Sequence, residues 1–401
     1  MLEVSKKISP KGWMLVPAAH NIMGVLNNKE DVQSTLFVGG CVRNLLLNQP
    51  VEDLDIATTY TPDIVQELCA QAGFKTFPTG IEHGTITVIA EGQSFEVTTL
   101  RQDVETDGRR ATISYTTSWR QDAMRRDFTM NTLLADINGN IYDPLGTGLS
   151  ALEQKQIVFV GNPHDRIKED YLRILRFFRF HAYYGDGEPD GMALKACRDL
   201  SENISKLSRE RISQEFFKIM SSEKGVETLE LMRKLNVLEE IIPQNLEQLE
   251  ILCRRQIQHN LNHLMARIFV LTLCESQIEE RFSTYLLFTN RQTRVLKELR
   301  NTLQKWPYKS IKELIYREGH EVAEQVILIM EEEGRLKQNL EVVETWNVPN
   351  FPINGHDAKS LDIPENKEMG KFLQKVEDWW IEQDFQPTKS DLIDYMKSLI
   401  R

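Results

Sequence analysis

The strand signals of this 401-residue chain stop near residue 149, and this change of character constrains its fold more than any other feature. Up to residue 148, short β-rich runs alternate with helical patterns and turn residues. From there to the C-terminus long helical patterns dominate, with few Gly or Pro residues between them. Strands followed by helices favour separate domains over one doubly wound sheet. The sequence therefore predicts an α+β protein with an N-terminal α/β head and an all-helical remainder.

Two hairpins are expected in the head. Residues 85–90 and 95–100 are β-rich, and the four residues between them include Gly92. Asn138-Gly139-Asn140 likewise separates the apolar residues 133–137 from 141–142. Short glycine-containing loops between such runs are typical of β-hairpins.

The charge and the cysteines exclude several classes of protein. Lys+Arg 48 minus Asp+Glu 59 gives −11, so any nucleic-acid site must be a local basic patch on an acidic protein. The 5 cysteines are far apart and lack C-x-x-C spacing, which argues against a zinc ribbon or a disulfide framework and fits a reducing compartment. We expect a cytoplasmic protein without a membrane partner, because neither a signal peptide nor a run of ~18 apolar residues is evident. An organelle stays an open alternative, although no transit peptide is evident.

A pair of glycines marks the point where a short strand turns into a helix. Gly39 and Gly40 follow the apolar residues 36–38, and residues 42–47 have a helical pattern. Backbone N–H groups at such a turn can hold a triphosphate, and the helix dipole favours its negative charge. A tight turn that needs glycine gives the same pattern, so this pair alone does not decide the function.

Two carboxylates follow this turn. Asp53 and Asp55 are separated by one residue, and alternate residues of a strand point to the same face. Such a pair can share Mg²⁺ ions, which clamp the attacking and leaving oxygens of a phosphoryl transfer. Glu96, on a later strand, could add a third carboxylate if the two strands pair. A solvated strand face is the alternative for all three.

Two further clusters carry arginines. Arg125-Arg126-Asp127 and Asn131 form the first cluster, in which the guanidinium forks suit phosphate or ribose and Asp127 could hold one of them in place. The second has a helical pattern that brings Asp170 and Arg173 together at i,i+3 spacing, and its basic stripe is formed by Arg166, Lys168, Arg173, Arg176 and Arg179. Charged surface segments with internal salt bridges give the same patterns.

Jointly, these motifs resemble those of one family. Gly39-Gly40-Cys41-Val42-Arg43, Asp53-Leu54-Asp55, Arg125-Arg126-Asp127-Phe128-Thr129-x-Asn131 and Glu169-Asp170-x-x-Arg173-x-x-Arg176 occur in order and at fitting distances. The chain resembles the class II tRNA nucleotidyltransferases, or CCA-adding enzymes, of the tRNA nucleotidyltransferase/poly(A) polymerase family. The likeness continues through Glu210-Arg211, Glu215 and residues 351–357, so it covers nearly the whole chain.

The resemblance implies a fold and an activity. It implies a polymerase-β-like catalytic head, for which we expect residues 1–148, a helical neck, expected at 149–215, and a tRNA-binding body and tail, expected at 216–401. It implies template-independent addition of C, C and A to the 3′ end of tRNA from CTP and ATP, with Mg²⁺ bound by Asp53 and Asp55. We expect Glu96 to join the catalytic set. The expected nucleotide-binding set comprises Gly39, Gly40, Arg43, Arg126, Asp127, Asn131, Glu169, Asp170, Arg173, Arg176 and Arg179.

Two positions depart from the family pattern. The family usually has Asp directly after the Gly-Gly-x-Val-Arg unit, where this chain has Asn44, and Gly four residues later, where it has Asn48. Neither is expected to bind metal, so the departures concern the orientation and affinity of the nucleotide rather than the chemistry.

An Asp–Arg pair can select C and A by hydrogen bonding. Cytosine and adenine each present an amino donor beside a ring acceptor, which match an ionised Asp170 and the guanidinium of Arg173. Uracil and guanine reverse both groups. At ~1–3 kcal/mol for each contact, two reversed contacts give a discrimination of ~100-fold or more.

Three other functions stay open as alternatives. A poly(A) polymerase would be expected to have a basic C-terminal extension, whereas residues 377–384 are acidic. A CC-adding enzyme would be expected to lack the polar segment 103–110, which we interpret as a flexible loop and which the resemblance links to addition of A. A non-catalytic RNA-binding protein would not need Asp53 and Asp55. Weak candidates for the tRNA surface are Lys206, Arg209, Arg211 and Lys218.

Overall fold

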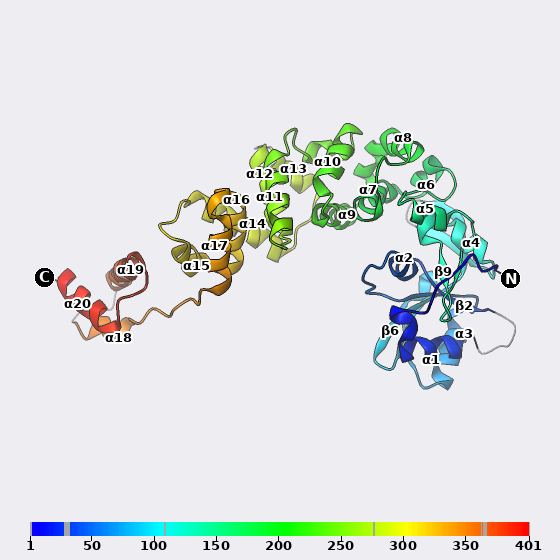
Figure 1. Cartoon of the computed structure of the whole chain (residues 1–401), viewed down its shortest axis with the longest axis horizontal. Coiled ribbons are helices and arrows are strands. Elements are labelled where there is room, and N and C mark those ends of the chain that lie inside the picture. Colours follow the sequence, from blue (N-terminus) through cyan, green and yellow to red (C-terminus); the bar gives the residue numbers. More distant parts are fainter. Residues whose placement is uncertain are drawn as a thin grey trace. The chain divides into compact units, whose positions relative to one another are not determined.

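The structure of the chain is a computed structural model that describes residues 2–27, 33–107, 110–275, 277–361, 363 and 367–400. It comprises two compact units (Figure 1). The first consists of Met1–Ile242 with Phe282–Leu286, and the second of Pro243–Arg281 with Leu287–Arg401. Every described strand lies in the first unit.

An 8-stranded sheet forms the centre of the first unit. Its order is β1-β10-β9-β2-β3-β6-β5-β4. The strands are β1 (Lys6–Lys7), β2 (Thr35–Val38), β3 (Asp55–Thr58), β4 (Lys75–Gly80), β5 (Thr85–Ala90), β6 (Gln93–Thr99), β9 (Leu134–Ala135) and β10 (Asn140–Tyr142). Neighbouring strands pair antiparallel, except that β3 and β6 run parallel.

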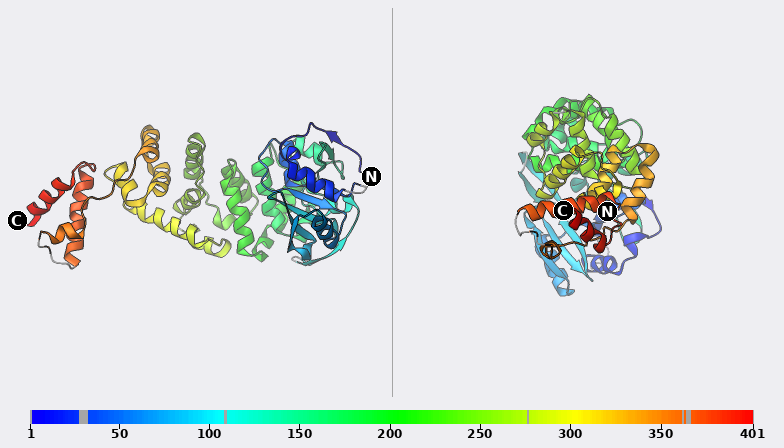
Figure 2. Two further views of the ribbon diagram at one scale, coloured as in Figure 1. Left: turned by 90° about the horizontal axis from the view of Figure 1, so that it is seen from below. Right: turned by 90° about the vertical axis from the view of Figure 1, so that its left-hand side faces the viewer.

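One face of this sheet is covered by helices α1 (Pro17–Leu26) and α3 (Pro62–Gln71), which contact its strands (Figure 2). Each helix begins with proline, which is pre-organised for a first helical turn. The alternation of β5 buries Ile86 and Val88 and leaves Thr85 and Thr87 partly exposed. The pleat therefore separates an apolar face from a polar face.

Helices connect the sheet to the rest of the first unit. They are η1 (Gly12–Leu15), α2 (Gly40–Leu46), η2 (Ile81–His83), α4 (Trp119–Met124), η3 (Thr129–Asn131), α5 (Gly148–Glu153), α6 (Pro163–Glu169), α7 (Leu172–Tyr184), α8 (Gly191–Leu200), η4 (Ser201–Lys206), α9 (Arg209–Ser221), α10 (Gly225–Lys234) and η5 (Glu239–Ile241). Helix α7 packs against α9 and α10. Its residues Leu172, Leu175 and Phe178 are buried, as their spacing predicts.

An aromatic cluster joins α7 to the segment that follows α4. The ring centroid of Phe128 lies 4.9 Å from those of Phe159 and Phe180, and 6.5 Å from that of Phe177. All four rings are buried, and such tilted aromatic pairs contribute beyond their buried area. This cluster fixes the position of the chain at residue 128 relative to α7.

The second unit is helical throughout its described part. Its helices are α11 (Glu247–Gln258), α12 (Leu264–Cys274), α14 (Asn290–Gln304), α15 (Ile311–Glu318), α16 (His320–Met330), α17 (Glu333–Thr345), α18 (Gly355–Lys359), α19 (Lys367–Glu382) and α20 (Lys389–Ile400), and α13 (Ile278–Tyr285) contributes residues to both units. A core that includes Val376, Trp380 and Leu392 holds the last three helices together. No helix in the described residues is long and apolar enough to span a membrane.

The predicted fold class is confirmed. Strands stop at β10 in the part of the chain that the structure describes, and both expected hairpins form. Glu91 and Gly92, with φ of 50° and 82°, form the tight turn of the first hairpin. All 5 cysteines are free, and all except Cys274 are buried. The boundaries expected at residues 148 and 215 stay predictions.

The prediction of a flexible loop at 103–110 was wrong for its secondary structure. Strands β7 (Arg101–Asp107) and β8 (Arg110–Tyr115) form a two-stranded antiparallel sheet, and residues 108–109 lie outside the described part. The many charged residues concealed β-branched ones such as Val104, Thr106 and Thr112, which favour strands.

We expect Phe128→Ala to destabilise the first unit by about 3–5 kcal/mol, because it leaves a cavity among three packed rings. The measurement is urea unfolding followed by circular dichroism. Phe77→Ala, at a position that is 49% exposed, is the control and should change the free energy of unfolding by less than about 0.5 kcal/mol. Equal effects of the two substitutions would contradict this assignment of the core.

Candidate active site

Two of the predicted catalytic carboxylates lie side by side on the sheet. Asp55 is the first residue of β3 and pairs in register with Glu96 on the parallel strand β6. Directly opposed residues point to the same face of a sheet, so both face away from α1 and α3. Sequence analysis expected Glu96 to lie with the aspartates only if the two strands pair. Strands β3 and β6 do pair.

Asp53 lies outside the strand, so its expected position within a strand was wrong. Strand β3 begins at Asp55, and the ladder extends only to Leu54, whose carbonyl accepts a hydrogen bond from the N–H of Glu96 at 3.2 Å. Leu54 and Ile56 are buried, as predicted, while Asp53 is exposed. The two aspartates thus lie just before and at the start of the interior strand β3, with Asp53 exposed and Asp55 partly buried.

Ionisation of the Asp55 carboxyl group is unfavourable when no cation is bound beside it. Burial raises its pKa first, and the negative charges of Glu96 and Asp53 raise it further, against the opposing effects of Arg126 and Arg43. A cation beside these groups would relieve this repulsion, so the donor set fits a hard metal ion. Among the described residues no three His, Cys, Asp or Glu side chains converge closely enough to form a metal site by themselves.

A pocket of about 560 Å³ opens beside Asp53 and Asp55. It is lined by Gly40, Cys41, Arg43, Asn44, Gln49, Pro50, Val51, Glu52, Asp53, Asp55, Arg179, Tyr183, Tyr184 and Lys218. The pocket therefore lies between the strand-to-helix turn, the segment before β3 and the helices α7 and α9.

The two glycines serve the turn as expected. Gly39 has a φ of 73°, which a residue with a Cβ rarely adopts, and α2 begins at Gly40. A Cβ at Gly39 would lie 3.4 Å from Nη1 of Arg126. Glycine thus lets this arginine approach the turn.

Arg43, on α2, is buried and donates four hydrogen bonds to neutral groups. Its guanidinium donates to Oδ1 of Asn131 at 2.6 Å and to the hydroxyl of Tyr184 at 2.8 Å. It also donates to Oδ1 of Asn44 at 2.9 and 3.1 Å, and lies 4.1 Å from the centre of the Tyr184 ring. Burial lowers the pKa of Arg43.

The adjacent arginines 125 and 126 are held by Asp122, not by Asp127. The buried carboxylate of Asp122 accepts from Arg125 at 2.8 Å and from Arg126 at 2.9 Å. Burial alone would raise the pKa of Asp122, but the two guanidinium groups outweigh burial and lower it. The expectation that Asp127 holds one of these arginines was wrong because Asp122 precedes them by one helical turn.

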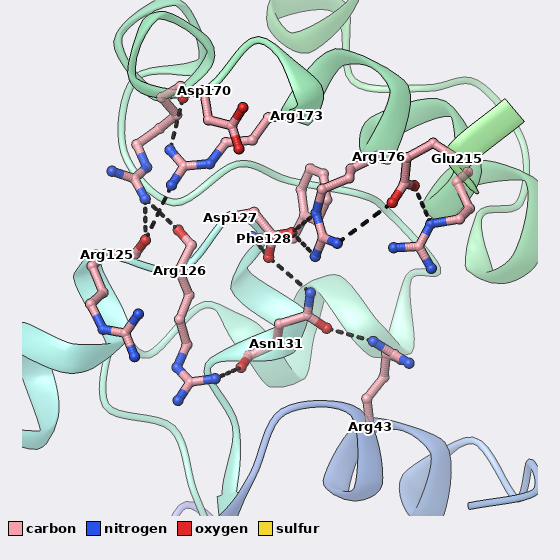
Figure 3. A network of polar contacts seen from close by, with 12 residues as sticks. Arg43, Arg125, Arg126, Asp127, Phe128, Asn131, Asp170, Arg173, Arg176 and Glu215 are labelled. Atoms are coloured by element: carbon pink, nitrogen blue, oxygen red, sulfur yellow. Dashed lines mark hydrogen bonds and ion pairs between the residues drawn. The ribbon is translucent and has the colours of Figure 1, made fainter. Parts of the chain in front are cut away.

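Asp127 instead connects its own segment to helix α7 (Figure 3). One carboxylate oxygen accepts from the amide of Asn131 at 2.9 Å, and the other accepts from Arg176 at 2.5 Å. Burial opposes ionisation of Asp127, but Arg176 and Asn131 prevail and lower its pKa. Because Oδ1 of Asn131 also accepts a hydrogen bond from Arg43, a continuous chain of contacts runs from α7 to α2.

The arginines predicted to form a basic stripe have carboxylate partners. Arg176 and Arg179 both contact Glu215 on α9, at 3.9 and 2.5 Å. Arg166 and Arg173 share Glu169, and Arg166 also donates to the backbone carbonyls of residues 125 and 126. The four arginines of the stripe therefore belong to ion-pair networks, while Lys168 is exposed.

The proximity of Asp170 and Arg173 has a different basis from the predicted one. Asp170 is not helical: α6 ends at Glu169 and α7 starts at Leu172. Its backbone carbonyl accepts from the N–H of Arg173 at 3.0 Å, and its carboxylate binds Arg211 at 2.7 Å. The two residues thus lie at a break between helices, and their side chains have different ion-pair partners.

Both departures from the family pattern have a structural account. The amide of Asn44 accepts from Arg43 and donates to the carbonyl of Pro50 at 2.8 Å. Asn48 has a φ of 55° at the end of α2, a conformation that Asn tolerates better than most residues. Asn48 therefore replaces the usual glycine without breaking the helix end.

Sequence reasoning missed two residues of the site. Asp122 could have been found from its spacing of three and four residues to Arg125 and Arg126. Tyr184 carried no local signal, because its contact with Arg43 joins residues 141 apart.

Comparisons with known proteins assign the class of the head. Residues 35–158 match the family model described as poly A polymerase head domain, and residues 190–249 match one described as a probable RNA and SrmB-binding site of polymerase A. The mitochondrial CCA tRNA nucleotidyltransferase 1 of Mus musculus is 32% identical, over 90% of this chain and 86% of its own length. A CCA-adding enzyme of Leuconostoc citreum is 29% identical, over 91% and 92%.

A solved structure shares the fold. The CCA-adding enzyme of Bacillus stearothermophilus, determined in complex with CTP, has a TM-score of 0.76 at 23% identity and covers 96% of this chain and 98% of its own. The chain thus has the fold of a nucleotidyltransferase with a helical remainder. By its identity to the curated relatives, it belongs to the family of CCA tRNA nucleotidyltransferases, or CCA-adding enzymes.

Asp122→Asn should lower the free energy of unfolding at pH 7 by about 3–5 kcal/mol, because it leaves two guanidinium groups without their buried partner. The folded-state pKa of Asp122 is lowered, so the stabilisation by its charge is complete above its unfolded value of ~3.9 and is lost as pH falls through the folded value. The difference between the two proteins should therefore shrink below about pH 4.

Urea unfolding at pH 7, 5 and 3 measures this difference. Glu153→Gln is the control, because Glu153 pairs with Lys6 on the surface and should contribute less than about 1 kcal/mol. A difference for Asp122→Asn that stays constant between pH 7 and 3 would contradict the role assigned to its charge.

Proposed function

We propose that the chain adds C, C and A to the 3′ end of tRNA, using CTP and ATP and releasing diphosphate. One observation supports this proposal most: Asp53 and Asp55 line a pocket that also contains Arg43, and Asp55 stands in register with Glu96 on the parallel strand β6. Carboxylates and an arginine at one pocket suit a reaction between a nucleoside triphosphate and an RNA hydroxyl.

Asp53 and Asp55 would hold Mg²⁺, and Glu96, in register with Asp55 on β6, would add negative charge beside them. Burial, and then the negative charges of Glu96 and Asp53, raise the pKa of Asp55, and a cation bound beside these carboxylates would offset both effects. When bound, the metal supplies charge for the attacking and leaving oxygens of the in-line displacement.

The chain's own residues bind and orient the reactants. Arg43 and Arg126 flank the turn at Gly39 and Gly40 and would position the triphosphate. The RNA 3′ oxygen forms a bond to the α-phosphorus, the bond from this phosphorus to the bridging oxygen breaks, and diphosphate leaves. As this bond forms, the 3′ hydroxyl loses its proton. The nearby carboxylates of Asp55 and Glu96 would accept it.

Asp170 and Arg173 would select the base. The ion pair with Arg211 fixes the carboxylate of Asp170, and Glu169 with the carbonyl of Arg166 fixes the guanidinium of Arg173. Fixed partners lower the entropy cost of ordering both groups against a base edge. The amino group of cytosine or adenine would donate to Asp170, and the ring nitrogen beside it would accept from Arg173.

The remaining assignments follow from the same family pattern. The helical remainder would bind tRNA through its shape and backbone, and the β7–β8 hairpin would permit the final addition of A. The cytoplasmic compartment stays a prediction, since the relatives of this chain include a mitochondrial enzyme. Mg²⁺ as the particular divalent ion rests on the oxygen donors of Asp53 and Asp55.

Asp53→Asn or Asp55→Asn should lower the rate of addition at least ~100-fold, because each removes a negative metal donor. The assay uses tRNA lacking its 3′ CCA, Mg²⁺, and CTP and ATP singly and together. Three residues added by the wild-type protein support the proposal, while a long ladder with ATP alone would indicate a poly(A) polymerase. Circular dichroism confirms that the variants fold. Undiminished addition by both would contradict the catalytic assignment.

Asp170→Arg combined with Arg173→Asp should weaken the use of CTP and ATP by ~100-fold, because it reverses both contacts to the base. The measurement is kcat/KM for each of the four nucleoside triphosphates with a suitable tRNA primer. The single variant Arg211→Gln serves as control, since it loosens Asp170 without reversing a contact. A nucleotide preference equal to that of the wild type would refute this mode of selection.

A further inference from the structure

The residues that would bind the two ends of a nucleotide lie on different segments of the first unit. Arg126, which would hold the triphosphate, follows α4, whereas Asp170 and Arg173, which would read the base, lie at the junction of α6 and α7. A single nucleotide can meet both groups only if the distance between the two segments is fixed. The side chain of Arg166, on α6, connects these segments.

The guanidinium of Arg166 has acceptors on both segments. Its Nη2 donates to the backbone carbonyls of Arg125 and Arg126, to the second at 2.9 Å. Its Nη1 donates to the carboxylate of Glu169, at the end of α6. Because a guanidinium holds its donors in one plane at fixed angles, these contacts restrict the relative position of three acceptors.

Glu169 extends this arrangement to the base-reading arginine. Its Oε2 accepts from Arg166 and also from Nη1 of Arg173, at 2.5 Å. The same Nη1 donates to the backbone carbonyl of Arg166 at 2.7 Å, and Nη2 of Arg173 donates to the carbonyl of Arg125 at 3.4 Å (Figure 3). Arg166 and Arg173 therefore hold one carboxylate between them and contact the same backbone carbonyl of the head.

Arg166 acts on its neighbours and not on the pocket. It is 8% exposed and is not among the residues that line the pocket beside Asp55. A buried guanidinium that loses its acceptors is costly, so its contacts resist displacement. Arg126 is thus held twice, at its carbonyl by Arg166 and at its guanidinium by Asp122.

We propose that Arg166 is a positioning residue for nucleotide selection, which sets the distance between Arg126 at the triphosphate and Arg173 at the base. The proposal rests on the proposed function and adds to it a residue that acts through others. While this distance is kept, a triphosphate bound at Arg126 presents its base to Asp170 and Arg173 in one orientation. Without Arg166 the orientation is loosened, and a base with reversed hydrogen-bonding groups is rejected less strongly.

A buried arginine in the second unit offers a matched control. Arg255, on α11, is also 8% exposed. It donates to the carboxylate of Glu333 at 3.2 Å and to the backbone carbonyl of Leu328 at 2.8 Å. Arg255→Gln therefore removes the same kinds of contact as Arg166→Gln, in a unit that contributes no residue to the pocket beside Asp55.

The test compares kcat/KM for CTP with that for UTP, on tRNA that lacks its 3′ CCA. Arg166→Gln should lower the ratio of the two values about tenfold, because the contacts that reject uracil lose their fixed geometry. Arg255→Gln should change the ratio less than twofold. Arg166→Lys keeps the positive charge but loses the planar fork, so its ratio should still fall at least about threefold. Circular dichroism and urea unfolding establish that each variant folds.

A second measurement shows whether Arg166 acts through Arg173. Arg166→Gln is combined with Arg173→Gln, and the ratio for CTP and UTP is measured for both single variants and the double variant. If Arg166 serves to position Arg173, the double variant should have a ratio within about twofold of that of Arg173→Gln alone. A solely structural role of Arg166 would lower stability and leave the ratio unchanged.

Three results would overturn the proposal. They are an unchanged ratio in folded Arg166→Gln or Arg166→Lys, a loss of equal size in Arg255→Gln, and multiplication of the separate effects of Arg166→Gln and Arg173→Gln in the double variant. Wild-type protein that adds no nucleotides would instead refute the proposed function, so the two failures are distinguishable.

Discussion

The contact between the buried carboxylate of Asp127 and the guanidinium of Arg176 is the interaction on which the site depends. From Asp127 the contacts continue to Asn131, then to Arg43, and through Tyr184 back to the helix that carries Arg176. A closed ring of contacts thus ties α2 and the segment around residue 127 to two points of α7, Arg176 and the C-terminal Tyr184. Since burying charges is costly, such a ring persists only when every member is paired or hydrogen-bonded.

The ring sorts the arginines into two groups. Those bound by buried carboxylates, such as Arg126 and Arg176, are held in fixed orientations, and their positive charge is compensated by their partners. Arg43 is held as firmly, but by an asparagine pair and a tyrosine, so its charge stays available. On the opposite side, Asp55 and Glu96 repel each other at their paired positions on the sheet. A phosphate with its cation satisfies both sides at once.

Much of this arrangement was predictable from the sequence. The glycine pair, the hairpins and the end of the strands were found because their signals are local, in turn residues and periodicity. The association of Glu96 with Asp55 was only conditional, because strand pairing across 41 residues leaves no local trace. The helical interpretation of Asp170 was wrong for a related reason: the short break at Asp170 and Tyr171 between α6 and α7 does not disturb the periodicity. The contact of Tyr184 with Arg43 needed the folded structure, whereas Asp122 was open to prediction from its spacing to Arg125 and Arg126.

A double-mutant cycle of Asp127→Asn and Arg176→Gln measures the central interaction most directly. The free energy of unfolding and the free energy of CTP binding are determined for the wild type, both single variants and the double variant. If the ring positions the nucleotide site, the effects on both quantities are non-additive by more than about 1 kcal/mol, because either substitution already opens the ring. Effects that add within about 0.5 kcal/mol in both quantities would show that the two residues act independently and would contradict the account.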